Sequence, residues 1–349
     1  MQELPYEIFL GDSQNILKTL PENLVHSVVT DPPAGINFLN KKWDSNRGGR
    51  DEWIKWLNGI MRECYRVLKP GGYALIWAIP RTSHWTATAV ENAGFQIKDV
   101  ITHLFGSGFP KSQDIARLIR TSKLETASDG NFRLQEVSRW QGWGTALKPS
   151  SEHWILAQKP ISEINLATNL IRHGVGALNI DAARIKTLDK IQPTQNIKFK
   201  RDLIFNAKNA ERGDYYHPHL NGRFPANTIL IDTKTEESPV KIIDEQAGKN
   251  SAKYFKIFSP YFYCAKPVER EKGEFNTHPT VKPIRLMRYL IKLVTPQGGI
   301  VLDPFMGSGT TGMSAILENS RFLGIEQDAA YFEIAKKRLS SVKTKAEGT

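Results

Sequence analysis

Two short runs in this sequence carry residue types that could do chemistry, and they lie near opposite ends of the chain. Near the start, Val28–Ala34 reads Val-Val-Thr-Asp-Pro-Pro-Ala. Its prolines fix the backbone and remove two N–H donors, so the loop presents the Asp31 carboxylate and the Pro32 carbonyl as acceptors. Such a pair suits an exocyclic amino group, and it would stabilise positive charge on the nitrogen as a bond forms there. A turn that ends a strand is the alternative for these residues alone.

The second run, Val301–Thr311, reads Val-Leu-Asp-Pro-Phe-Met-Gly-Ser-Gly-Thr-Thr and lies between a predicted strand and a predicted helix. Gly307 and Gly309 let the backbone approach a ligand and place helix amides beside it. Glu326, 19 residues after Gly307, ends the next predicted strand, where a carboxylate can accept both hydroxyls of a ribose. The third glycine of a dinucleotide fingerprint is missing, and nothing here favours a pyrophosphate over a smaller adenosine ligand. A tight turn is the alternative interpretation of the glycines.

Strands and helices alternate over both ends of the chain, and this alternation must position the two runs. The pattern predicts strands at 6–10, 26–30, 73–79, 95–105, 153–158, 299–303 and 321–325, and helices at 13–20, 51–68, 84–92, 284–293, 311–318 and 329–339. We expect Ser13 to cap the first helix and 69–72 to form a turn. The alternation predicts an α/β fold with a doubly wound, mostly parallel sheet. Ligands bind such sheets beyond the carboxyl ends of strands, where Asp12 and Asp31 both fall.

The middle of the chain, 161–276, has short apolar pieces and many turn residues. Between Arg184 and Arg223 it holds nine Lys or Arg against four Asp or Glu. The aromatics Phe199, Phe205, Tyr215, Tyr216 and Phe224 are interleaved with these charges. This composition suits phosphates and unstacked bases, and an irregular insertion with its own small core is the alternative. The formal net charge of +11 also favours a polyanionic partner.

Bulk composition excludes several other classes of protein. The 349 residues can hold one large core or one core with a smaller domain. No apolar run approaches the roughly 18 residues that span a bilayer, and the start lacks the regions of a signal peptide, so we expect a cytoplasmic protein with no membrane partner. Cys64 and Cys264 make no disulfide framework, and the eight histidines lack zinc spacing, so we expect no metal.

Three motifs together resemble those of S-adenosylmethionine-dependent DNA amino-methyltransferases. They are Asp31-Pro32-Pro33-Ala34, Phe305-Met306-Gly307-Ser308-Gly309 and His278-Pro279-Thr280-Val281-Lys282-Pro283. Their order, with the catalytic loop first and the cofactor loop last, resembles the permuted β class of that family. The resemblance implies a permuted, Rossmann-like class I methyltransferase fold. It also implies a catalytic half at 1–160, a target-recognition and DNA-binding insertion at 161–276, a cofactor-binding half at 277–342 and a tail at 343–349.

The resemblance also implies parts for individual residues. Asp31, Pro32 and Pro33 form the catalytic loop, of which Asp31 and Pro32 bind the target amine. Glu326 holds the ribose of S-adenosylmethionine, and Asp12 lies near its adenine ring. The full set of implied cofactor-binding residues is Asp12, Thr280, Asp303, Phe305, Gly307, Gly309, Thr310 and Glu326.

One position departs from the family pattern. The loop usually ends in an aromatic residue that stacks on the target base, and here that position is Ala34. Our hypothesis is that Phe38 or Trp43, the nearest aromatics in sequence, takes over the stacking. The alternative is that both belong to the core and stacking is lost.

The implied reaction is direct transfer of a methyl group to the N6 amine of a flipped adenine in double-stranded DNA. Aspartate rather than serine at position 31 favours adenine over cytosine in this family. Methylation of the N4 amine of cytosine, or of a base in RNA, is the alternative enzyme. An inactive nucleic-acid-binding subunit is the alternative from another class, for which Ala34 is the only hint. A homodimer and a cognate restriction enzyme are partners that the resemblance leaves open.

Overall fold

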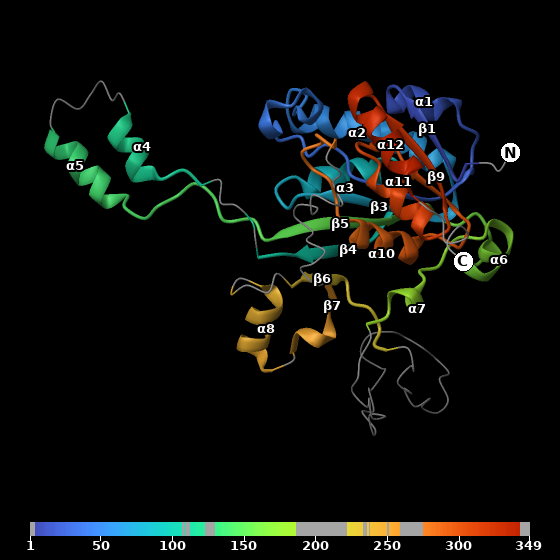
Figure 1. The fold of residues 1–349 in the computed structure, drawn as a ribbon. Helices are drawn as coiled ribbons and strands as arrows, with labels where there is room; N and C mark the ends of the chain where they lie inside the picture. Colours follow the sequence, from blue (N-terminus) through green and yellow to red (C-terminus); the bar gives the residue numbers. More distant parts are fainter. Residues whose placement is uncertain are drawn as a thin grey trace.

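One mixed β-sheet organises the computed structural model, which describes residues 4–106, 108, 112–122, 130–185, 222–232, 236, 238–249, 251–258 and 275–342. In this part of the chain the strands lie in the order β1-β9-β8-β2-β3-β5-β4-β6-β7 (Figure 1). Their bounds are β1 Tyr6–Leu10, β2 Val25–Thr30, β3 Leu68–Ala78, β4 Gln96–Leu104, β5 Ser151–Gln158, β6 Thr228–Ile231, β7 Lys256–Phe258, β8 Ile300–Asp303 and β9 Arg321–Glu326. Only β5 is antiparallel to its neighbours, β3 and β4. The predicted α/β fold with a mostly parallel sheet is confirmed.

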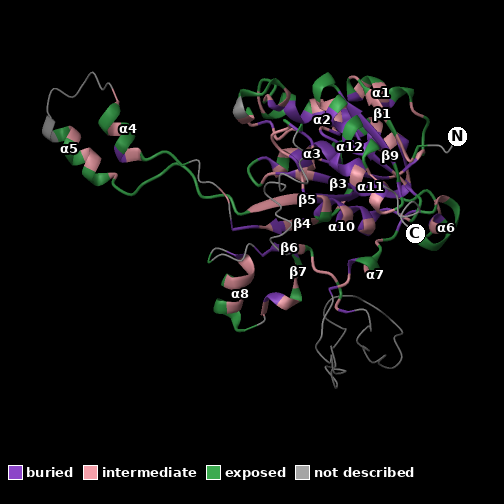
Figure 2. Cartoon of the chain, in the orientation of Figure 1, coloured by how far each residue is buried: buried purple, intermediate pink, exposed green. Residues whose placement is uncertain are grey.

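Helices cover both faces of the sheet. On one face lie α1 (Ser13–Thr19), α2 (Arg50–Val67) and α3 (Ser83–Asn92), and on the other α10 (Ile284–Val294), α11 (Thr310–Leu317) and α12 (Ala329–Ser340). Successive residues of a strand point to opposite faces, so Val28 joins the first core and Val29 the second. The predicted helix at 51–68 is confirmed as α2, whose buried residues recur at helical spacing: Trp53, Leu57, Ile60, Met61 and Cys64. Hydrophobic cores on both faces of the sheet therefore hold its strands in place (Figure 2).

Two local predictions were wrong by small margins. The N-cap of α1 is Asp12, whose side chain accepts the amide of Asn15 at 3.1 Å, and Ser13 is already helical. Residues 69–72 are not a free turn, because they form an irregularity inside β3. There β2 pairs Val25 with Leu68 and then Ser27 with Tyr73. Pairing with β2 on both sides keeps these residues in the sheet despite the proline and two glycines.

The predicted insertion at 161–276 shares the central sheet. Its strands β6 and β7 extend the sheet beyond β4. Its helix α6 (Leu166–His173) contacts β3, α7 (Ile180–Ala183) contacts α10, and α8 (Pro239–Ala247) contacts β6. Most of the basic and aromatic stretch falls at 186–221, and the tail falls at 343–349. Both lie outside the described residues.

A second excursion leaves the sheet between β4 and β5. It carries α4 (Ile115–Thr121) and α5 (Gly130–Arg139), which contact each other and lie well away from the sheet in Figure 1. The alternation of strands and helices in the sequence did not predict it. No described helix is long and apolar enough to cross a membrane.

The irregularity in β3 generates a prediction about stability. Asn169 is fully buried on α6, and its side-chain amide donates to the carbonyls of Pro70 and Val175, both at 2.9 Å. We expect Asn169→Ala to lower the free energy of unfolding by roughly 2–4 kcal/mol, because two buried acceptors lose their donor. Urea denaturation measures it, with exposed Asn92→Ala as the control. Equal midpoints for the two variants would show that these bonds do not hold the irregularity.

Candidate active site

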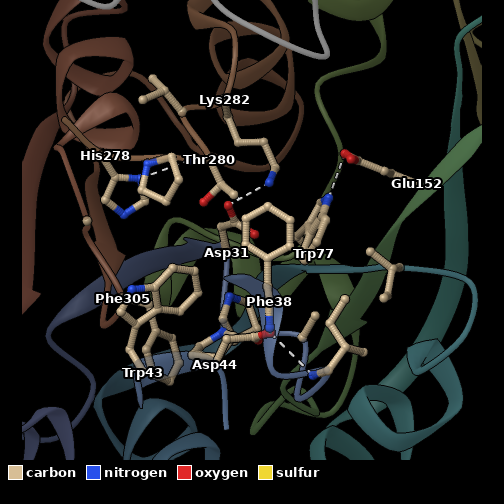
Figure 3. Close-up of a pocket in the computed structure, with 18 of the residues that line it drawn as sticks. Asp31, Phe38, Trp43, Asp44, Trp77, Glu152, His278, Thr280, Lys282 and Phe305 are labelled. Atoms are coloured by element: carbon tan, nitrogen blue, oxygen red, sulfur yellow. Dashed lines mark hydrogen bonds and ion pairs between the residues drawn. The ribbon is translucent and has the colours of Figure 1, made fainter. Parts of the chain in front are cut away.

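A cavity of about 1380 Å³ lies at the carboxyl edge of the sheet and is lined by all three motifs (Figure 3). The neighbouring strands β1, β9, β8 and β2 are all parallel, so their carboxyl ends meet at this edge. Asp12, Glu326, Asp303 and Asp31 follow or end these four strands, and all line the cavity. The volume exceeds the few hundred to about 1,000 Å³ of a typical small-molecule site. It has room for a cofactor and a second ligand together.

Asp303 ties the two motif loops to each other. Its carboxylate accepts Thr30 Oγ1 at 2.7 Å, Thr311 Oγ1 at 2.6 Å and the amide of Phe305 at 3.0 Å. The residue is 1% exposed, and this burial raises the pKa of its carboxyl to about 6. With both oxygens already engaged by the protein, Asp303 shapes the loop around the ligand space.

The glycine loop needs both of its glycines. Gly307 and Gly309 have φ of +53° and +81°, a region that L side chains rarely adopt. A Cβ on Gly307 would lie 3.0 Å from the ring of His278, and one on Gly309 would lie 3.1 Å from Ala335. The loop therefore packs closely on its neighbours and leaves its backbone open to the cavity.

Glu326 holds the glycine loop from the next strand. Its carboxylate accepts the amides of Gly307 and Asp328, each at 2.8 Å. Burial raises the pKa of this carboxyl above its usual range. Each carboxylate oxygen has two lone pairs, so acceptor capacity remains for ribose hydroxyls.

Arg338 was missed from the sequence because it lies among the apolar residues of α12. It is 3% exposed, and its Nη1 donates to Ser308 Oγ at 2.9 Å and Thr310 Oγ1 at 3.0 Å, and also to the Ser308 carbonyl. The Thr310 side chain is thus engaged by Arg338, and both residues serve the shape of the loop. The role of this arginine becomes visible only in the contact between α12 and the glycine loop, 30 residues apart in sequence.

Aromatic and charged side chains wall the other side of the glycine loop. The Phe305 ring packs on Trp56 with centroids 5.6 Å apart, and the Arg47 guanidinium lies 3.8 Å from the Trp56 ring centre. Asp12 and Thr280 line the same cavity. Seven of the eight implied cofactor residues therefore line one cavity, and the eighth, Gly309, packs against Ala335 on α12.

The catalytic loop carries an ion pair that sequence reasoning did not predict. Lys282 Nζ donates to Asp31 Oδ2 at 2.6 Å and lies 3.8 Å from the centre of the Trp77 ring. Burial raises the pKa of the Asp31 carboxyl to about 6, although the Lys282 ammonium acts in the opposite direction. Lys282 belongs to the predicted motif at 278–283, but it serves the catalytic loop.

A second acid lies on the far side of Trp77. Glu152 Oε2 accepts the Trp77 indole N–H at 2.8 Å, and His103 Nδ1 lies 3.8 Å away. Burial would raise the pKa of Glu152, but Lys282, His103 and Trp77 outweigh it and hold that pKa at about 2. Glu152 is therefore an anion close to the Lys282 ammonium.

The two stacking candidates occupy different parts of the cavity (Figure 3). The buried carboxylate of Asp44 accepts the amides of Gly35 at 2.9 Å and Phe38 at 2.7 Å, which folds the chain after Ala34 back on itself. The Phe38 ring then projects into the cavity that Asp31 also lines. Trp43 instead stacks on His278, with centroids 6.2 Å apart. Trp77 is a third aromatic at the site, which the sequence did not single out.

No group of three or more His, Cys, Asp or Glu in the described part of the chain could hold a metal ion. Residues 25–337 match the family described as DNA methylase. The chain is 44% identical to the DNA adenine methyltransferase YhdJ of Escherichia coli strain K12, over 95% of this chain and 82% of that protein. It is 25% identical to the type II methyltransferase M.HindIII of Haemophilus influenzae, over 95% and 94%. The fold matches the PvuII DNA methyltransferase (cytosine-N4-specific) with a TM-score of 0.53 and 14% identity, over 95% and 86%.

The ion pair at Asp31 predicts a measurable titration. We expect the Asp31 carboxyl to titrate near pH 6 and Lys282→Met to raise that midpoint, because the variant removes the ammonium that favours the charged carboxylate. Carboxyl ¹³C shifts against pH measure it, assigned by their loss in Asp31→Asn. Lys292→Met is the matched control, since Lys292 pairs with Glu318 at 2.9 Å. A midpoint that Lys282→Met leaves in place would contradict the pairing.

Proposed function

Because this chain belongs to the DNA methylase family, we propose that it transfers a methyl group from S-adenosylmethionine to the N6 amine of adenine in double-stranded DNA. One observation carries the proposal: the Asp31 carboxylate and the glycine loop line a single cavity large enough for both reactants. The relative YhdJ, named as a DNA adenine methyltransferase, supports adenine as the target.

The residues at the glycine loop fit S-adenosylmethionine. Phe305 and Gly307 line the cavity, and the positive φ of Gly309 sets the turn of the loop beside them. Glu326 would accept the ribose hydroxyls, Asp12 would lie near the adenine ring, and Thr280 would contact the methionine end. The cofactor supplies a methyl group bonded to a positively charged sulfur, ready for displacement.

The catalytic loop would bind and polarise the amine. Asp31 and the Pro32 carbonyl accept its two N–H groups and stabilise the charge that develops on nitrogen. Only the ionised Asp31 carboxylate supplies the negative charge that stabilises this nitrogen, since a protonated carboxyl keeps an acceptor oxygen but is neutral. The target amine must also displace the Lys282 ammonium from Asp31. Glu152 offers that ammonium a second anion within the same cavity.

The partners proposed for this enzyme follow from its substrate and its relatives. A base inside a duplex cannot reach Asp31, so the target adenine must leave the stack. M.HindIII is named a type II methyltransferase, and on that ground we propose a cognate restriction enzyme as a functional partner. Light scattering of the purified protein tests whether it is a homodimer.

Removal of the catalytic carboxylate tests the function. We expect Asp31→Ala to lower methyl transfer by about 10²–10³-fold or more, because the developing charge loses its acceptor, while S-adenosylmethionine affinity stays within about twofold of wild type. Exposed Asp51→Ala is the control. Mass spectrometry of digested DNA measures the product. Full activity in Asp31→Ala would overturn the mechanism, and N4-methylcytosine in place of N6-methyladenine would overturn the choice of base.

The position of Phe38 predicts that it replaces the missing aromatic at Ala34. Stacking of a base on an aromatic ring is worth about 1–3 kcal/mol, so we expect Phe38→Ala to lower kcat/KM by roughly 5–150-fold. Ala34→Tyr in that background should restore part of the loss. Trp43→Ala should instead weaken cofactor binding, measured by calorimetry, since Trp43 packs on His278. If Phe38→Ala changes kcat/KM by less than about twofold, stacking by Phe38 is excluded.

A further inference from the structure

Residues 112–148, which we call the arm, form an insertion between β4 and β5 with an organisation of their own. Helices α4 and α5 lie at its far end (Figure 1). Nearer the sheet, Asp114 pairs with Gly144 in an antiparallel bridge, and the amide of Gln113 donates to Thr145 Oγ1 at 3.0 Å. These contacts hold the two connecting segments together. The arm is therefore a built element with its own internal contacts.

The topology of the sheet places the base of the arm at the active site. Strand β5 is antiparallel to both β3 and β4, so β4 runs in the same direction as β3 and β2. The end of β4 and the start of β5 therefore lie at the edge where β2 delivers Asp31. Ala146, Leu147 and Lys148 at the base of the arm, and Gly108 just before it, line the cavity that Asp31 lines.

The surface of the arm is basic and rich in exposed aromatic and apolar side chains. Residues 112–148 hold six Lys or Arg against four Asp or Glu. Arg117 and Arg120 on α4 are exposed, and the Arg139 side chain on α5 is 70% exposed. Trp143 is 60% exposed and packs against Trp140 with centroids 5.1 Å apart. Ala116 is the one buried residue among those of the arm whose burial is described (Figure 2).

We propose that the arm binds the DNA duplex beside the flipped base, with Arg117, Arg120 and Arg139 on its phosphates. This rests on the proposed function, because a base that enters the cavity leaves its duplex at the cavity mouth. A polyanion complements the arm in charge. A second copy of this chain, with its own net charge of +11, complements it poorly. DNA contact is thereby assigned to a segment outside the insertion at 161–276.

The reach of the arm matches this partner. An extended chain spans at most about 3.3–3.6 Å per residue, so the segment 141–150 alone can reach roughly 35 Å. That length is about one turn of B-DNA. The arm can therefore contact phosphates at a distance from the flipped base while its last residues, 146–148, remain at the cavity.

Charge reversal on the arm tests the proposal. The variant is Arg117→Glu/Arg120→Glu, and the matched control is Lys18→Glu/Lys336→Glu, which reverses two exposed charges on α1 and α12. A random-sequence duplex of three helical turns is titrated at several salt concentrations. We expect the arm variant to bind about tenfold or more weakly, with a log–log salt slope smaller by about two. Cofactor affinity and Tm should match those of the control.

A second variant keeps the test sharp. Residues 112–144 are replaced by a short Gly-Ser linker, which the antiparallel β4–β5 pair accommodates as a hairpin. It should retain cofactor binding and lose affinity for the duplex. DNA affinity equal to that of the control in both variants overturns the proposal. So does a change confined to oligomeric state by light scattering, which would assign the arm to a second copy.

The two failures are distinguishable. If the wild-type protein binds duplex DNA through the arm but methylates no base, the proposed function fails and the arm proposal stands. If the wild type methylates adenine and both arm variants match the control in DNA affinity and KM, the arm proposal fails and the function stands.

Discussion

The hydrogen bond from Thr30 Oγ1 to Asp303 Oδ1, 2.7 Å long, joins two loops that are 273 residues apart in sequence. It exists because β2 and β8 are parallel neighbours, with Val28 opposite Leu302. Asp31 follows Thr30 directly, and the same Asp303 carboxylate accepts the amide of Phe305. The loop proposed to bind the amine and the loop proposed to bind the cofactor are thus joined through one buried carboxylate. Their order along the chain has no consequence for the chemistry, since strand adjacency alone brings them together.

Burial at that point also sets the charges of the site. Asp31 and Asp303 both have pKa values raised to about 6, because a buried carboxylate loses its hydration. For Asp303, hydrogen bonds from two hydroxyls and an amide compensate for this lost hydration. For Asp31 the described partner is the Lys282 ammonium. That ion pair stabilises the buried Asp31 carboxylate when no nucleobase is bound. A target amine that displaces the Lys282 ammonium must donate its own N–H groups to Asp31. The site therefore favours a hydrogen-bond donor over an acceptor at this position.

Much of the fold was predictable because it rests on local patterns. The periodicity of apolar residues predicts the buried face of α2. Together with the positions of proline and glycine, it also predicts that strands end at Asp31 and Glu326. The unpredicted features depend on contacts distant in sequence. Lys282 donates to Asp31, which is 251 residues away in sequence, and Trp77 donates to Glu152, which is 75 residues away. Residues 69–72 stay in β3 because β2 pairs on both sides of them. The arm was missed because its short helices leave most of their side chains exposed, so they carry little core pattern.

At Ala34 the fold separates a motif position from Phe38, the side chain that we propose takes over its role. Thr82 Oγ1 donates to the Ala34 carbonyl at 3.0 Å, which holds the backbone of the loop in place whatever side chain stands there. The Asp44 carboxylate then accepts the amides of Gly35 and Phe38 and bends the chain. The ring of Phe38, four residues after Ala34, therefore projects into the cavity. A buried aspartate thereby decides which aromatic ring projects into the space where, in the proposed function, the target base would lie. In the proposed function the motif itself supplies the acceptors, and the fold around Asp44 supplies the aromatic ring.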